Sequence, residues 1–152
     1  MLKLTLALAA LALAASCSQE PSAPKRNPRL PEPSALAATM QAMTADMEAL
    51  KIKAQAGTLT LSDVESLRMA HESIKTDQPT KPEDIKESYP GFADAYLANL
   101  DNLYEAIKNQ EDVEAQIEAF NAVISTCESC HQQHCPGPLE RIGGIKAAAL
   151  VP

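Results

Sequence analysis

The spacing of the apolar residues constrains the fold more than any other feature of the sequence. In four separate segments they recur every three or four positions, which places them on one face of an α-helix. The chain is rich in Ala and Leu, aromatic residues make up 3% of it and Trp is absent, a composition that favours helices over sheets. The sequence therefore predicts an all-α protein.

Four amphipathic helices joined by modest loops predict an antiparallel four-helix bundle. If successive helices alternate in direction, the first helix starts beside the end of the fourth, so Met40 and Met43 are expected to approach His131. The four apolar faces are Leu36, Met40, Met43, Met47 and Leu50; Val64, Leu67, His71 and Ile74; Ala93, Tyr96, Leu97, Leu100, Leu103, Tyr104 and Ile107; and Val113, Ile117, Phe120, Ile124, Cys127 and His131.

Polar residues, glycine and proline predict where these helices begin and end. Ser34 is the expected N-cap of the first helix, and Gly57 its expected end. Ser62 and Glu65 have the Ser-x-x-Glu form of a capping box and predict the start of the second helix. Residues 77–90 contain three prolines and are expected to form a loop, after which the third helix begins. Pro136 must end the fourth helix.

The first 16 residues have the layout of a secretory signal peptide. One Lys is followed by a Leu/Ala run and then by small residues, and the run is shorter than the roughly 20 residues of a membrane span. Cys17 follows Leu13-Ala14-Ala15-Ser16, which resembles a bacterial lipobox and predicts a lipid anchor on Cys17. The alternative is cleavage after a small residue without lipidation, which would leave a soluble periplasmic protein.

Residues 17–33 contain five spaced prolines among polar neighbours, a pattern that forms neither a helix nor the centre of a sheet. We expect a lipid-anchored, Pro-rich tether here. Residues 34–152 are then the four-helix bundle with a C-terminal extension. Ser18 is not the Asp associated with retention in the inner membrane, so the outer membrane is favoured.

Near the end of the fourth helix, Cys127-Glu128-Ser129-Cys130-His131 has the Cys-x-x-Cys-His form that attaches a c-type haem. Thiols one helical turn apart can each bond a haem vinyl carbon, and the adjacent imidazole can bind the iron. One covalent haem c at Cys127, Cys130 and His131 is therefore predicted. The alternatives are a dithiol redox site, a zinc site that adds His134 and Cys135, and a structural disulfide.

A four-helix chain with this motif near its C-terminus resembles the class II cytochromes c, which include the cytochromes c′. The resemblance covers residues 34–135. It implies a bundle fold, a proximal iron ligand at His131 and periplasmic electron transfer. Low-spin members fill the sixth iron site with a Met from the first helix, and Met40 occupies the matching place. Met43, His71 and an open site are the alternatives. Two roles are expected of His71, either packing or a contact with the haem, through a propionate or the iron.

Two positions depart from that family. A basic residue commonly follows the haem His by four positions, where it can meet a haem propionate, but Cys135 stands there. Arg141 and Lys146 are the candidates to take over this charge. Cys135 is expected to pack as a small apolar residue, or else to be a reactive thiol or to form an intermolecular disulfide. The role of His134 is left open.

The predicted function is periplasmic electron transfer by a monohaem cytochrome with His/Met ligation, without enzymatic activity. The alternatives are a five-coordinate haem protein that binds NO or CO, and the haem subunit of a membrane redox complex. The net charge of −7 argues against nucleic acid as a partner. The expected partners are redox proteins and, through the lipid, a bacterial membrane. The resemblance also implies that a homodimer can form, although no dimer face is identifiable.

Overall fold

The structure is a computed structural model that describes residues 32–149. The chain divides into two units, Met1–Pro31 and Glu32–Pro152. The predicted signal peptide, the lipid-anchor Cys17 and the tether up to Pro31 therefore lie outside the described residues.

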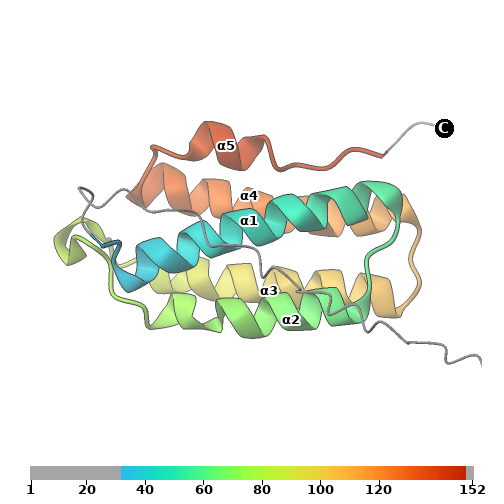
Figure 1. Cartoon of the computed structure of the whole chain (residues 1–152), viewed down its shortest axis with the longest axis horizontal. Helices are drawn as coiled ribbons and strands as arrows, with labels where there is room; N and C mark the ends of the chain where they lie inside the picture. Colours follow the sequence, from blue (N-terminus) through green and yellow to red (C-terminus); the bar gives the residue numbers. More distant parts are fainter. Residues whose placement is uncertain (1–31, 150–152) are drawn as a thin grey trace, which may run out of the picture. The chain divides into compact units, whose positions relative to one another are not determined.

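The described residues form α-helices and short 3₁₀ turns, with no strand among them. Four main helices pack against one another, α1 (Ala35–Ala56), α2 (Leu61–His71), α3 (Tyr89–Lys108) and α4 (Val113–His134), and successive ones run in opposite directions (Figure 1). The 3₁₀ turns are η1 (Glu72–Lys75) and η2 (Pro82–Asp84), and a short helix, α5 (Leu139–Gly143), follows α4. None of these helices is long and apolar enough to cross a membrane.

The centre of the core is the interface between α3 and α4, the most extensive helix pair. Leu100 and Leu103 of α3 and Phe120 and Val123 of α4 have no exposed surface. These residues belong to the predicted apolar faces or lie beside them, so the helical period correctly identified the buried side of both helices. Burial of each such side chain contributes about 1.5–3 kcal/mol.

The ends of α1 follow the prediction. The Ser34 side chain accepts a hydrogen bond from the Ala37 backbone N–H at 3.2 Å. Gly57 ends the helix in the left-handed region, at φ 63°, and the Thr58 N–H donates to the Lys53 carbonyl at 2.9 Å. A Cβ on Gly57 would lie 2.7 Å from the Val113 side chain, so only glycine fits between α1 and the start of α4.

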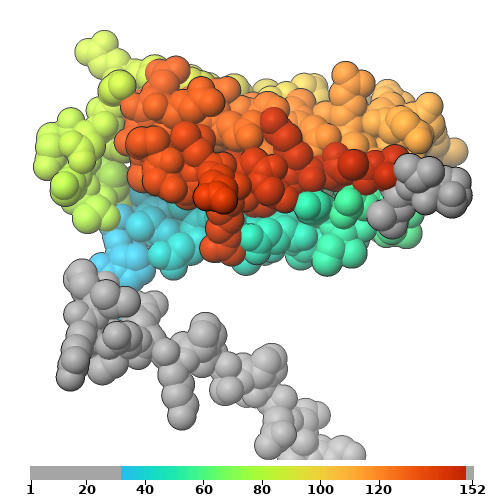
Figure 2. Space-filling view, turned by 90° about the horizontal axis from the view of Figure 1, so that it is seen from above, coloured from blue at the N-terminus to red at the C-terminus, as the bar shows by residue number. Residues whose placement is uncertain are grey.

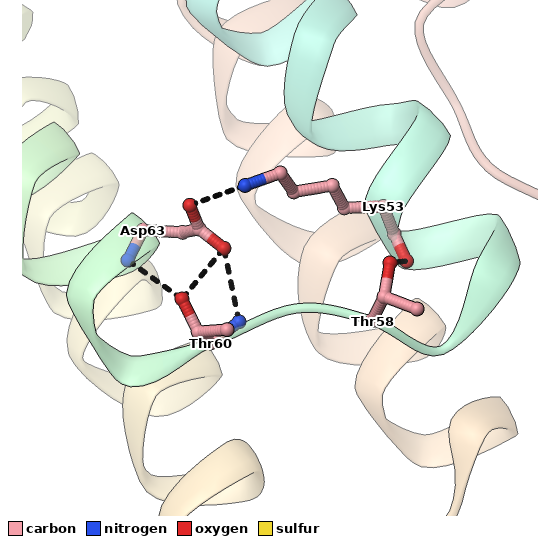
Figure 3. A network of polar contacts seen from close by, with 4 residues as sticks. All are labelled: Lys53, Thr58, Thr60 and Asp63. Carbon is pink, nitrogen blue, oxygen red and sulfur yellow. Dashed lines mark hydrogen bonds and ion pairs between the residues drawn. The ribbon is translucent and has the colours of Figure 1, made fainter. Parts of the chain in front are cut away.

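The start of α2 differs from the prediction, because its N-cap is Thr60 and not Ser62 (Figure 3). The Asp63 N–H donates to the Thr60 hydroxyl at 3.2 Å, and the Thr60 N–H donates to the Asp63 carboxylate at 3.0 Å. Lys53 of α1 contacts the same carboxylate at 2.6 Å. Asp63 therefore both completes the capping box of α2 and links α2 to α1.

Two further boundaries differ from the sequence reading. The third helix begins at Tyr89, with Pro90 in its first turn. Backbone N–H groups in the first turn have no acceptor within the helix, so a proline there removes no helical hydrogen bond. The second apolar face continues past α2, because Ile74 is buried in η1. The extension after Pro138, for which no helix was predicted, begins with α5.

Candidate haem site

The Cys-x-x-Cys-His motif lies in the last two turns of α4. Asp112 caps the start of this helix by accepting from the Ala115 N–H at 2.9 Å. From there the buried face continues to Ile124 and reaches Cys127 one turn later. Cys127, Cys130 and His131 are all partly buried. The helix therefore presents the motif at the margin of the core.

The imidazole of His131 has a fixed tautomer. Its Nδ1 lies 2.9 Å from the backbone carbonyl oxygen of Cys135, and because a carbonyl can only accept, Nδ1 carries the hydrogen. Cys135 adopts φ −156° because it precedes Pro136, which disfavours the helical region for it. The lone pair on Nε2 is left available to a metal, an arrangement that metal-binding histidines commonly show.

A cavity of about 600 Å³ lies between α1, the loop before α3, the end of α4 and the C-terminal segment. This volume falls within the range of roughly 300–1,000 Å³ that cofactor sites occupy, and the lining is mostly apolar. The predicted site residues among its lining are Met40, Cys127, Cys130 and His131. The cavity therefore brings together residues that are about 90 positions apart.

The methionines of α1 differ in how they meet this cavity. Met43 and Met47 are 5% and 2% exposed and belong to the core, although both also line the cavity. Met40 is only partly buried and packs against the core from its edge. The Thr44 hydroxyl donates to the Met40 carbonyl at 2.8 Å. Of the three thioethers, that of Met40 is the least committed to core packing.

The two motif thiols are protonated at neutral pH. Burial and, to a smaller extent, the neighbouring Cys130 raise the pKa of Cys127 to about 12. Burial likewise raises the pKa of Cys130 to about 11. Thiol exchange requires the thiolate, and redox-active Cys-x-x-Cys sites lower the thiol pKa to provide it. The surroundings of this pair are thus unlike those of a dithiol redox site.

The described residues contain neither a disulfide nor a preformed cluster of metal ligands at the motif. All three cysteines of the described chain, at positions 127, 130 and 135, are free. Within residues 32–149, no group of three or more His, Cys, Asp and Glu side chains is arranged to hold a metal ion.

Cys135 is exposed at the rim of the cavity, so the expectation that it packs as a small apolar residue is wrong.

His71 is a packing residue, which is one of the two roles expected of it. It is 1% exposed, and its Nε2 lies 3.0 Å from the Asp46 carboxylate and its Nδ1 2.6 Å from the Tyr96 hydroxyl. The carboxylate accepts from Nε2–H, so in the neutral ring Nδ1 accepts from the tyrosine. Both nitrogens are occupied, and His71 does not line the cavity, which argues against His71 as an iron ligand.

His134 holds the loop that walls the cavity, a role that sequence reasoning missed. Its Nδ1 accepts from the Lys86 N–H at 3.2 Å, and its Nε2 lies 3.2 Å from the Ser88 hydroxyl. Its ring also meets Tyr89 and Phe92 edge-on. These partners lie more than 40 residues away, so no local pattern in the sequence could have revealed them.

The two candidates for a propionate partner are in different positions. Arg141 lines the cavity but forms a two-bond ion pair with Glu48, at 2.8 and 3.1 Å. Lys146 pairs with Glu128 at 2.6 Å and is not among the lining residues. Lys81, which was not predicted, also lines the cavity.

The donor set around this cavity fits a covalently bound haem. It consists of two thiols one turn apart, an imidazole with an available nitrogen and a thioether from another helix, all at a largely apolar cavity. No family model, no curated protein and no solved structure matches the chain.

Proposed function

We propose that this protein is a monohaem c-type cytochrome that transfers electrons in the periplasm. The observation that carries the proposal is that one largely apolar cavity is lined by Cys127, Cys130, His131 and Met40, with Nε2 of His131 available. A chain with this site on the last of four helices is what the resemblance to class II cytochromes c implies. The finer fold assignment, an antiparallel bundle of that class, belongs to the same proposal.

Each of the four residues has one role. Cys127 and Cys130 would form the thioether bonds that prevent the cofactor from dissociating, and His131 and Met40 would be the two protein ligands of the iron. When bound, the haem supplies Fe(III)/Fe(II) cycling. The Cys135 carbonyl keeps His131 in the required tautomer and strengthens it as a ligand. The apolar lining excludes water, and thioether ligation raises the potential relative to two imidazoles.

The setting of the protein is part of the proposal. Cys17 carries the lipid that attaches the protein to a bacterial membrane, with the outer membrane favoured, and residues 17–33 form the tether. The partners are redox proteins that meet an acidic chain of net charge −7.

A second candidate function, binding of NO or CO at a five-coordinate iron, is favoured by one observation. A separate cavity of about 30 Å³ is lined by the motif residues together with Met40, Met43 and Tyr96. This volume is that of a single small molecule such as water. This small apolar space lies beside both proposed iron ligands, Met40 and His131.

Absorption spectra of the exported protein separate these functions. The electron carrier is expected to give a sharp α-band when reduced, which carbon monoxide leaves unchanged over the time of the measurement. A broad band that carbon monoxide alters at once would favour the gas-binding function. Cys127→Ala/Cys130→Ala is the matched control, because it retains His131 and Met40 but cannot hold a haem covalently.

A further inference from the structure

Residues 139–149, which we name the C-terminal strap, lie along the seam between α1 and α4. Figure 2 shows this red segment between orange α4 and cyan to green α1. Ile142, Ile145 and Ala147 are 6%, 4% and 7% exposed and join the core. Arg141, Ile142 and Ile145 also line the haem cavity. The strap therefore forms part of the cavity wall.

The strap contacts α1 in a constant register. Arg141 pairs with Glu48, Lys51 donates to the Gly144 carbonyl at 2.8 Å, and Gln55 donates to the Ala148 carbonyl at 3.3 Å. Each contact joins residues that are 93 positions apart. Residues 48, 51 and 55 lie on one face of a helix. The strap thus runs parallel to α1 over two turns.

The same segment is also fastened to α4. Asn121 donates to the Ala147 carbonyl at 2.9 Å and accepts from the Ala147 N–H at 2.8 Å, so its side-chain amide pairs with the backbone like a strand neighbour. Lys146 contacts Glu128, which lies inside the haem motif, at 2.6 Å. Arg141 thus pairs with α1, and Lys146 pairs with α4.

The two helices that the strap connects are those that carry the proposed axial ligands, Met40 on α1 and His131 on α4. Exposed ion pairs contribute little to stability, so the burial of Ile142 and Ile145 provides most of the free energy that keeps the strap in place. We propose that the strap clamps α1 to α4, keeps Met40 in reach of the iron bound by His131, and closes the cavity to exogenous ligands. This inference rests on the proposed haem site.

The first test compares the full chain with a chain that stops after Pro138. We expect the truncated ferric protein to lose the weak red absorption band of thioether ligation. We expect the reduced truncated protein to bind carbon monoxide about tenfold more tightly or better, because minor open states are populated at roughly 0.1–10% in an intact protein. Leu67→Ala, a core change in α2 away from the cavity lining, should alter neither property.

A second variant keeps the test decisive if the truncated chain does not fold. Ile145→Ala retains every polar contact of the strap and removes only an apolar side chain from the cavity wall. It should tighten carbon monoxide binding and weaken the thioether band, in both cases by less than the truncation does. Unchanged affinity and band in a folded variant would overturn the clamp.

A readout that does not need the haem separates this proposal from the proposed function. Amide hydrogen exchange across α1 should accelerate more in Ile145→Ala than in Leu67→Ala at matched stability to denaturant. If the full chain carries no haem, the proposed function fails, and exchange in α1 still decides the clamp. Equal exchange in the two variants would show that the strap does not hold α1.

Discussion

The three histidines of the chain differ in what their ring nitrogens contact. Both ring nitrogens of His71 have hydrogen-bond partners, Asp46 and Tyr96. Both ring nitrogens of His134 have partners as well, Lys86 and Ser88. His131 differs, because among the described residues only its Nδ1 has such a partner, the Cys135 carbonyl, and its Nε2 has none. An unused nitrogen at a cavity wall is what a metal ligand requires, so the three side chains divide between structure and the proposed chemistry.

At the residue scale, Met40→Ala tests the distal ligand. We expect the variant to keep its covalent haem but to convert from a low-spin to a high-spin spectrum that responds to carbon monoxide, because Met43 and Met47, the other methionines that line the cavity, belong to the core. Absorption spectra of both redox states measure this. Met43→Ala is the control, and it should lower stability by about 2–5 kcal/mol while keeping the low-spin spectrum. A low-spin spectrum in Met40→Ala would rule out Met40.

His71 gives the protein an acid-sensitive core. Burial lowers its pKa below the ordinary 6.5, and the contact with Asp46 only partly opposes this. Between the folded pKa and about 6.5, the unfolded chain binds more protons than the folded one, so the stability falls as the pH is lowered through this window. Denaturant unfolding from pH 8 down to pH 5 should show the loss. In His71→Gln the decline should be shallower, and an equal decline would assign it to other groups.

At the scale of the elements, the capping of α2 offers a direct comparison of two neighbouring residues. Thr60→Ala removes the observed cap and should cost about 0.5–2 kcal/mol of unfolding free energy. Ser62→Ala alters the residue that the sequence pattern favoured, and should change stability by no more than about 0.5 kcal/mol. Chemical denaturation of both variants measures the difference. A larger cost at Ser62 would place the cap where the pattern had it.

The boundaries that were predicted correctly and wrongly have a common explanation. The caps at Ser34 and Gly57 are set by local backbone conformation, which the sequence reveals directly. At the start of α2 the sequence offers two similar local patterns two residues apart, Thr60 with Asp63 and Ser62 with Glu65, and the contact of Lys53 with Asp63 is a tertiary one that the sequence does not show. The short helix α5 was not predicted because its five residues give too little periodicity to detect.

At the scale of the whole molecule, the sequence predicted which residues share the cavity. The motif followed from its spacing, and the nearness of Met40 followed from the alternation of four helices. The rest of the wall was not predicted, because His134 and the strap are brought there by contacts over more than 40 residues. Arg141 was expected at the site, but its ion pair with Glu48 could not be read from the chain.

The central claim is that two thioether bonds hold one haem to this chain, and the intact mass of the exported protein tests it most directly. The protein should be produced in cells that mature c-type cytochromes and measured after denaturation. The expected mass is that of the polypeptide plus one haem. The added mass of the haem should be absent from Cys127→Ala/Cys130→Ala. A mass equal to that of the polypeptide with or without acyl chains, and no haem, would contradict it.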